Sequence, residues 1–292
     1  MTRAKPLILY HAGCADGFCA AWIAHRKFGD DADYLPVNYN EPLPDLARQG
    51  GRDLYILDFS YNRETLIQLA QTNHSVTVLD HHKTAQAALK DLQAPGLSIT
   101  FDMEKSGGRL TWEYFQSEGR PVPPMDSEHY RVCYTAPWLV DYTEDRDLWR
   151  WKLPASKEVS ATLASYQRDF KTWTMLYELA RGKEIPPVEL CREGAAILRY
   201  QAQLVESAVA NAVEIEMDGH KVLAVNATCL VSEICERLAK DRPFGASYFI
   251  HGDGRKIWSL RSREGGIDVS EVAKRHGGGG HKAASGFTEA KP

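Results

Sequence analysis

The chain has 292 residues, 43% of them hydrophobic and 25% charged, with a formal net charge of −4. This composition is that of a globular protein with room for two domains, each with its own core. The negative balance argues against a broad basic surface for long duplex nucleic acid, whereas a small phosphorylated substrate remains compatible. The sequence has no 18-residue apolar run and no cleavable signal pattern. We therefore expect no membrane partner and a cytoplasmic location.

The first 125 residues alternate between short apolar runs and helical patterns. Runs of four residues at 7–10, 54–57 and 76–79 are typical of strands buried on both faces. Further strands are expected at 33–38 and 98–101, and helices at 16–28, 64–72, 109–117 and 128–140. This alternation predicts an α/β domain with a parallel sheet.

A different pattern begins at Pro186-Pro187. Residues 188–213 are rich in Ala, Leu, Glu and Gln and predict a long helix with proline at its start. Hairpins are expected around 218–219 and 252–254, followed by a short helix at 269–275 and a glycine run at 277–280. The predicted organisation is a parallel-sheet catalytic domain (1–186), a linker helix (187–213) and a smaller α/β C-terminal domain (214–292).

Acidic and histidine residues follow each of the three buried runs. Ligands of open α/β sheets gather beyond the carboxyl ends of the strands, and carboxylates and imidazoles together can hold divalent ions such as Mn²⁺ or Mg²⁺. The sequence therefore predicts a metal site at this edge, and an acidic turn at 141–147 offers a further ligand. The strand-end residues are His11 and Asp16, then Asp58, then Asp80, His81 and His82.

Each of these features also has a structural explanation. Asp58 can begin a turn or cap a helix, and Asp145 and Asp147 can serve as caps or as partners of nearby arginines. The glycine run can be a hinge, or its backbone N–H groups can cradle a phosphate. Because all of these signals occur together in a strand-end arrangement, a metal site is favoured over separate structural roles.

The motifs together resemble those of the DHH phosphoesterase superfamily with its C-terminal DHH-associated domain, over nearly the whole chain. Members hydrolyse phosphodiester, phosphomonoester or phosphoanhydride bonds with Mn²⁺, so the resemblance implies the reaction class and leaves the substrate open. The matching segments are 11–17 (HAGCADG), Asp58, Asp80-His81-His82, Asp145, Ser259-Leu260-Arg261-Ser262 and 277–281.

The resemblance implies two metal ions, with Mn²⁺ expected and Mg²⁺ or another divalent ion left open. One ion would be held by His11, Asp58 and Asp145. The other would be held by Asp16, Asp58 and His81, so that Asp58 bridges the two. Two such ions neutralise charge on the phosphoryl oxygens.

Three neighbouring positions complete the expected centre. Asp80 would orient a histidine, and His82 would contact the substrate phosphate or act as an acid toward the leaving oxygen. Cys14 stands where relatives often carry aspartate. A thiolate is a softer ligand, so either Cys14 is no ligand and the first site is weak, or the metal preference is altered.

The C-terminal signature is expected to bind the part of the substrate that is not cleaved. If bases are bound, Tyr10, Phe59, Trp149 and Phe287 are candidates for stacking, although core packing is the first expectation for each. The expected substrate-binding residues are Arg261, Ser262, Gly278, Gly279, Gly280 and His281.

The leading interpretation is a Mn²⁺-dependent phosphodiesterase of the oligoribonuclease or exonuclease type. It would release mononucleotides from very short oligonucleotides or linear dinucleotides. The alternatives are a phosphatase of 3′-phosphoadenosine 5′-phosphate, an exopolyphosphatase-like hydrolase, and a non-catalytic nucleotide sensor. The intact ligand set favours an enzyme over a sensor. The preferred base, the direction of attack and the oligomeric state, including a homodimer, are left open.

Overall fold

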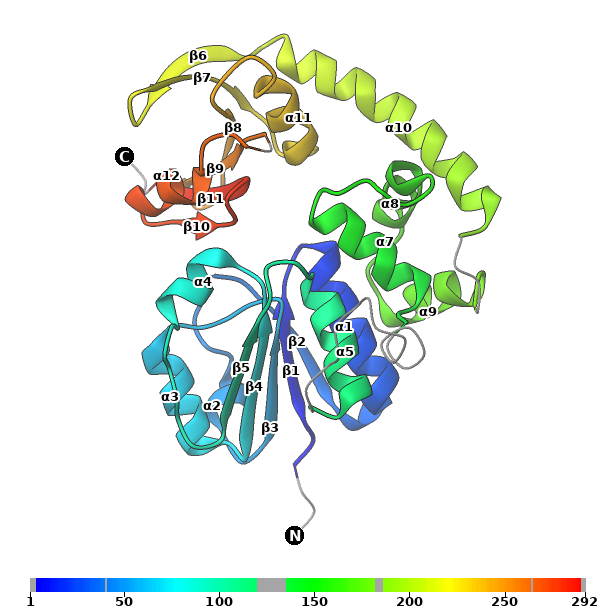
Figure 1. The fold of residues 1–292 in the computed structure, drawn as a ribbon, viewed down its shortest axis with the longest axis vertical. Helices are drawn as coiled ribbons and strands as arrows, with labels where there is room; N and C mark the ends of the chain where they lie inside the picture. The colour runs from blue at the N-terminus through cyan, green and yellow to red at the C-terminus, as the bar shows by residue number, and fades with distance from the viewer. Residues whose placement is uncertain (1–3, 40, 120–134, 182–185, 264, 290–292) are drawn as a thin grey trace. The chain divides into compact units, whose positions relative to one another are not determined.

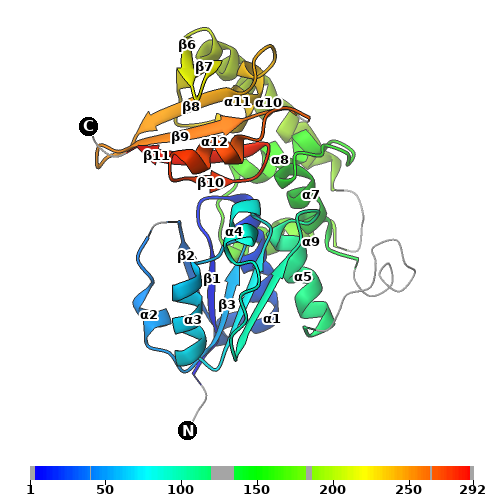
Figure 2. The same cartoon turned by 60° about the vertical axis from the view of Figure 1, so that its left-hand side comes forward.

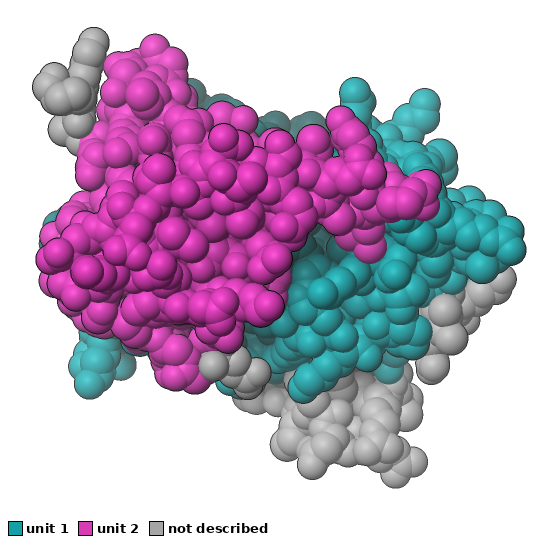
Figure 3. All heavy atoms as spheres, turned by 90° about the horizontal axis from the view of Figure 1, so that it is seen from above, with its two compact units in different colours: residues 1–195 teal, residues 196–292 magenta. Residues whose placement is uncertain are grey.

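The structure, a computed structural model, describes residues 4–39, 41–119, 135–181, 186–263 and 265–289. The chain divides into two compact units, unit 1 (Met1–Ala195) and unit 2 (Ala196–Pro292), which are coloured separately in Figure 3. None of the helices in these described ranges is long and apolar enough to cross a bilayer. Within the helix predicted at 128–140, residues 128–134 lie outside the described residues.

Unit 1 is built on a parallel sheet whose described strands follow the order β2-β1-β3-β4-β5 (Figure 1). Ile8, Ile56 and Val78 in its central strands are fully buried, as the continuous apolar runs predicted. The parallel α/β architecture expected from the sequence is therefore confirmed. The strands are β1 (Leu7–His11), β2 (Asp33–Val37), β3 (Asp53–Leu57), β4 (Ser75–Asp80) and β5 (Leu97–Phe101).

Helices cover both faces of this sheet, which explains why its central strands are apolar on both sides. α1 (Ala15–Phe28) and α5 (Gly107–Ser117) pack on one face, and α3 (Arg63–Thr72) lies on the other, as Figure 2 shows. Side chains alternate accordingly: Ile8 joins the cluster under α1 and α5, while Leu7 and its second neighbour Leu9 join the one under α3. The short elements of this half are η1 (Gly29–Asp31), α2 (Asp45–Arg48) and α4 (Lys83–Ala88).

A helical layer completes unit 1 and was largely missed by the sequence analysis. α7 (Trp138–Asp147) is followed by α8 (Ser156–Ser165) and α9 (Phe170–Glu178). Their apolar faces join α1 in one cluster that contains Trp22 and Trp173. The expectation of an acidic turn at 141–147 is wrong, because these residues form most of α7. Its buried Leu139, Val140 and Tyr142 anchor the helix in the core.

The long predicted helix is present as α10 (Val188–Val209), and the division between the two units falls inside it. Gly194 lets the start of α10 approach α8, because an added Cβ would lie 1.8 Å from the carbonyl oxygen of Glu158. A larger residue at position 194 would push these two helices apart.

Unit 2 contains a mixed sheet whose described strands follow the order β10-β11-β9-β8-β7-β6. Both predicted hairpins are confirmed as the antiparallel pairs β6·β7 and β8·β9. α12 packs on the face that carries Val222 and Ala224, and α11 on the face that carries Leu223 and Val225. The elements are β6 (Val213–Met217), β7 (His220–Asn226), α11 (Val231–Leu238), β8 (Gly245–Ile250), β9 (Lys256–Arg261), α12 (Val269–Arg275), β10 (Gly279–Gly280) and β11 (Ala284–Glu289).

Candidate metal centre

The register of the parallel sheet brings three predicted residues to one level of its edge. Leu57 in β3 is paired with Tyr10 in β1 and with Leu79 in β4. The residue that follows each of these three therefore lies at the carboxyl edge of the sheet, next to the corresponding residues of the adjacent strands. Those next residues are His11, Asp58 and Asp80.

Asp58 lies at the middle of the cluster and is 2% exposed. Its backbone turns sharply out of β3 with φ +56°, a left-handed conformation that aspartate and asparagine tolerate better than most residues. One carboxylate oxygen, Oδ1, lies 3.0 Å from Nε2 of His81. The other, Oδ2, lies 3.5 Å from Nδ1 of His11 and 3.2 Å from Sγ of Cys14.

Asp58 is shared by three groups of potential metal ligands, one of which it forms with Asp80 and His82, and the other two contain the residues expected to hold metal. His11, Cys14 and Asp58 form one group, and Asp16, Asp58 and His81 form the other, with the donor atoms of each group within 4.8 Å of one another. The structure thus brings together four of the five residues expected as metal ligands from the sequence. The same carboxylate faces both groups, which is the geometry needed for a bridging ligand.

Asp16 is held by the start of α5, a feature that the sequence analysis missed. The backbone N–H groups of Gly107 and Gly108 donate to its two oxygens at 2.5 and 2.9 Å. Ser106 caps the helix by accepting a hydrogen bond from the N–H of residue 109 at 3.2 Å. Gly107 is needed for this approach, because a Cβ there would lie 2.4 Å from the Cβ of Asp58. A serine before two glycines was the available sequence signal.

Cys14 points into the first ligand group. Its Sγ accepts a hydrogen bond from the N–H of Gly17 at 3.1 Å and so caps α1. Burial raises the pKa of this thiol well above its usual value, and the negative charges of Asp58 and Asp16 raise it further. Without a cation Cys14 is therefore a neutral thiol, and only a bound cation would make the thiolate an effective ligand.

Of the acidic residues at the end of α7, the structure places Asp147, and not the expected ligand Asp145, next to the cluster. Asp147, at the end of α7, places Oδ2 3.5 Å from Nε2 of His81. Asp145 points elsewhere because residues two apart on a helix face different directions. Its carboxylate instead anchors the segment that follows α7. The partners of Asp145 are the N–H groups of Lys152 and Leu153, at 3.0 and 3.3 Å, and the hydroxyl of Ser156, at 2.5 Å.

Asp80 orients the ring of His82. Its Oδ1 lies 2.7 Å from Nδ1 of His82 and also accepts the backbone N–H groups of His81 and His82. Burial alone would raise the pKa of Asp80, but the charge and hydrogen bond of His82 lower it. Burial opposes protonation of His82 as well, yet Asp80 raises the net pKa of that imidazole. The pair therefore favours a charged, fixed imidazolium.

The charges of the cluster fit a divalent cation. Burial and the negative charges of Asp58 and Asp147 raise the pKa of Asp16 well above its usual value. Burial opposes ionisation of Asp58 too, but hydrogen bonds from His11 and His81 hold its pKa well below the usual range. For His81, burial is outweighed by its hydrogen bond to Asp58 and by the nearby carboxylates, which raise its pKa to about 10. Without a metal, bound protons thus neutralise part of the buried negative charge of the cluster. A divalent ion would neutralise that charge in their place.

The predicted substrate-binding residues of unit 2 also adjoin one another. Arg261, at the end of β9, is paired with Ala284, and the N–H of Ser262 donates to the carbonyl of residue 283 at 3.0 Å. The N–H of His281 donates to the carbonyl of Ala284 at 2.8 Å, which closes a turn beside them. Arg261 donates from Nη2 to the hydroxyl of Ser232 at 3.0 Å.

Two of the glycines next to this turn have a packing role. A Cβ on Gly278 would lie 2.1 Å from the carbonyl oxygen of Gly286, and Gly280 has φ +135°. Gly279 pairs with Gly286 in the two-residue strand β10. Close approach of β10 and β11 therefore requires glycine at 278 and 280, whether or not a phosphate binds there.

Two curated relatives cover nearly all of the chain, while no protein-family profile matches it. It is 29% identical to the uncharacterized protein R106 of Acanthamoeba polyphaga mimivirus, over 96% of this chain and 66% of that protein. It is 27% identical to the oligoribonuclease NrnB of Bacillus subtilis (strain 168), over 95% of this chain and 71% of that protein. The chain thus spans about two thirds of the length of these relatives, and slightly less in the viral case.

Solved structures of low sequence identity share the fold. An exopolyphosphatase-related protein from Bacteroides fragilis matches with a TM-score of 0.58 and 13% identity, over 99% of this chain and 88% of that one. RecJ from Thermus thermophilus, solved in complex with Mn²⁺, matches with a TM-score of 0.51 and 16% identity, over 99% of this chain and 50% of that one.

The fold and the strand-end cluster define an α/β protein with a candidate metal centre in unit 1 and a second, smaller α/β unit. The motifs that resemble those of the DHH phosphoesterase superfamily thus stand in a chain that is similar to the oligoribonuclease NrnB over 95% of its length and that shares its fold with the two solved structures.

Proposed function

We propose that the protein is a Mn²⁺-dependent phosphodiesterase that hydrolyses very short oligonucleotides or linear dinucleotides to mononucleotides. The observation that carries this proposal is the buried Asp58 carboxylate, which is shared by the potential ligand groups of His11 and Cys14 and of Asp16 and His81. The likeness to the B. subtilis oligoribonuclease NrnB over 95% of the chain supports the substrate class.

In this proposal the ligands divide around Asp58. His11 and Cys14 would hold one ion with it, and Asp16 and His81 would hold the other, joined by Asp147. Oxygen and nitrogen donors of this kind suit Mn²⁺ and Mg²⁺, whereas the sulfur of Cys14 suits softer ions. Divalent ions in such a site neutralise charge on the phosphoryl oxygens and make water a stronger acid.

The neighbouring side chains would position the substrate and move its proton. Asp80 holds Nδ1 of His82 at 2.7 Å and so fixes the direction of the ring. The protonated imidazole would donate its proton to the leaving oxygen as the bond between that oxygen and phosphorus breaks and the oxygen of a water molecule bonds to phosphorus in its place. The N–H groups of Gly107 and Gly108 would keep Asp16 in place during this step. In unit 2, Arg261, Ser262, Gly278–Gly280 and His281 are the proposed contacts for the part of the substrate that is not cleaved.

The direct test uses metal-stripped protein and a 5′-phosphorylated dinucleotide, with products separated by chromatography. We expect mononucleotides to appear when Mn²⁺ is added, and a 24-nucleotide strand to be cleaved far more slowly. Asp58→Asn protein should release none. 3′-Phosphoadenosine 5′-phosphate and polyphosphate belong in the same panel.

The panel separates the alternatives. Hydrolysis of either of these last two compounds, with the dinucleotide left intact, would replace the proposed function with phosphatase or exopolyphosphatase activity. Tight nucleotide binding without turnover of any substrate would identify a sensor.

A further inference from the structure

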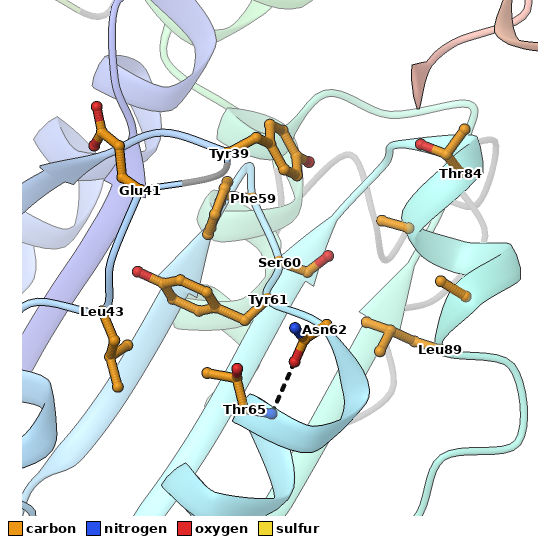
Figure 4. Close-up of a pocket in the computed structure, with 12 residues that line it drawn as sticks. Tyr39, Glu41, Leu43, Phe59, Ser60, Tyr61, Asn62, Thr65, Thr84 and Leu89 are labelled. Atoms are coloured by element: carbon orange, nitrogen blue, oxygen red, sulfur yellow. Dashed lines mark hydrogen bonds between the residues drawn. The ribbon is translucent and has the colours of Figure 1, made fainter. Parts of the chain in front are cut away.

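Unit 1 contains a pocket of about 360 Å³ (Figure 4). It lies beside the candidate metal centre, because Phe59, which follows Asp58, is one of its lining residues. Its volume is within the range of small-molecule sites, about 300–1,000 Å³. Three aromatic rings form one side, the start of α3 lies below them, and α4 closes the opposite side. Lining residues used below are Tyr39, Phe59, Tyr61, Asn62 and Ala85.

The aromatic side of the pocket is also the wall of the metal centre. Phe59 directly follows Asp58, and its ring lies 6.2 Å from that of His11, centre to centre. The ring of Tyr39 lies 5.6 Å from His11 and 5.8 Å from His82. A group bound against these rings would therefore be adjacent to a phosphate held by the two histidines.

Tyr39 offers a ring surface that is already positioned. Its centroid is 4.5 Å from that of Phe59, which in turn contacts Tyr61 at 4.9 Å. Phe59 is only 1% exposed, whereas Tyr39 is 41% exposed. The buried ring of Phe59 thus holds the exposed ring of Tyr39 in place. Because Tyr39 is already ordered, its side chain would lose little conformational entropy when a ligand stacks on it.

The charge of the lining excludes a second phosphate group. None of the described residues around the pocket is lysine or arginine, and Glu41 contributes a carboxylate. Asn62 uses its side-chain oxygen to accept the N–H of Thr65 at 2.9 Å, so its amide N–H₂ is the group left to interact with a ligand. An aromatic wall with a few polar groups suits a planar heterocycle.

We propose that this pocket binds the nucleobase of the nucleotide whose phosphate lies at the metal centre. The base stacks on Tyr39, with its polar edge toward Asn62. This inference deepens the proposed function and rests on it, because it assigns the base as well as the phosphate of a short oligonucleotide. Stacking is tolerant of base identity, so the pocket would distinguish nucleotides from other phosphates more strongly than one base from another.

Binding of two small products provides the test, because it does not depend on turnover. With Mn²⁺-loaded protein, adenosine 5′-monophosphate should bind about ten- to a hundredfold more tightly than ribose 5-phosphate, the expected contribution of one stacked base. Tyr39→Ala and Ala85→Trp should reduce this ratio to near one. The first removes the stacking surface, and the second fills the pocket from α4.

Ala87→Trp is the matched control, because residue 87 is an exposed alanine of the same helix that does not line the pocket. It should keep the wild-type ratio, and thermal melts should show that all variants are folded. As a second readout, a dinucleotide with one base removed should have a raised KM in wild type, and the same KM as the intact dinucleotide in Ala85→Trp.

Two results would overturn the proposal: equal binding of the two products by wild type, or an unchanged ratio in both pocket variants. Failure of the proposed function is a different result, the absence of dinucleotide hydrolysis in protein that still binds adenosine 5′-monophosphate through Tyr39.

Discussion

The strand-end edge of unit 1 and the glycine-rich turn of unit 2 differ in what makes them specific. At the edge, the proposed function depends on buried side chains such as Asp58 and His81, which contact one another. In the turn, Gly278 and Gly280 are required first by the backbone itself, because β10 approaches β11 closely. A substitution in unit 1 can thus remove chemistry from an intact fold, whereas one in the turn changes the fold as well.

The largest loss of activity is expected for substitution of Asp58. If no loss were observed, the contrast between the two regions would not hold. Asp58→Asn should lower Mn²⁺-dependent hydrolysis by at least about a thousandfold, because a shared ligand is worth several kcal/mol to the transition state. The fold should remain, since asparagine tolerates the left-handed backbone at φ +56°. Rates at saturating Mn²⁺ and thermal melts measure the two effects. Asp45→Asn, at a side chain 92% exposed, is the control. Activity above about a tenth of wild type would mean that Asp58 does not bridge.

Asp147 and Asp145 test the same distinction within one helix. Asp147→Asn should reduce hydrolysis about a hundredfold or more, since it removes a charged ligand beside His81, and should leave stability nearly unchanged. Asp145→Asn should instead lower the free energy of unfolding by about 2 kcal/mol, because its carboxylate accepts three hydrogen bonds. Urea unfolding and initial rates on both variants give the comparison. If Asp145→Asn were stable but catalytically defective, Asp145 would be a metal ligand, as expected from the sequence.

The contrast between Asp145 and Asp147 shows which part of the site could not be predicted from the sequence. The strand-end residues His11, Asp58 and Asp80 could be located because buried runs of four residues reveal the strands, and parallel strands end at one edge. The direction of an acidic side chain near residue 145 depends on helix phase, and positions two apart differ by about 200°. Since residues 141–147 were expected to form a turn, no phase could be assigned.

Other parts of the site depend on contacts between distant segments. The N–H of Gly107 reaches Asp16 across 91 residues, and no local pattern announces such a pairing. The pocket beside the metal centre joins the loop at Tyr39, the segment after β3 and helix α4. Phe59 was among the expected stacking residues, but the exposed ring in contact with it belongs to Tyr39. Periodicity predicts elements, while the site is assembled from the loops that connect them.

In unit 2, Arg261 should affect substrate selection more than the chemical step. Arg261→Ala removes a guanidinium at the glycine-rich turn and should reduce the preference for a dinucleotide over a small phosphodiester by about ten- to a hundredfold. The measurement is kcat/KM for both substrates. Arg237→Ala is the control, because Arg237 is a half-exposed arginine of the same unit that pairs with Glu206 on the surface. An equal loss for both substrates would assign Arg261 to the fold or to the metal centre.

Gly107 is a position in unit 1 where close backbone packing and the proposed chemistry depend on the same residue. It therefore tests whether the two regions differ as described. Gly107→Ala places a Cβ 2.4 Å from that of Asp58. We expect a loss of about 1–3 kcal/mol in unfolding free energy, typical of overpacking, together with weaker Mn²⁺ activation. Gly252→Ala, where a Cβ meets nothing within 4 Å, is the control. Normal stability and activity in Gly107→Ala would show that the edge adjusts more freely than its close contacts indicate.

The smallest effect is expected for substitution of Cys14. This side chain of unit 1 would change the metal preference of the site without being essential for activity. Cys14→Asp replaces a soft donor, 3.2 Å from Oδ2 of Asp58, with a hard carboxylate. The concentration of Mn²⁺ needed for half-maximal activity should fall several-fold, and activation by softer ions such as Zn²⁺ should weaken, because carboxylates favour the harder ion. Metal titrations of wild type and variant, side by side, measure both changes. Cys14→Ser separates the two roles of the residue, since a hydroxyl can still cap α1 but is a poor ligand. If Cys14→Asp needs as much Mn²⁺ as wild type, Cys14 only caps the helix, and the first ion would depend on His11 and Asp58 alone.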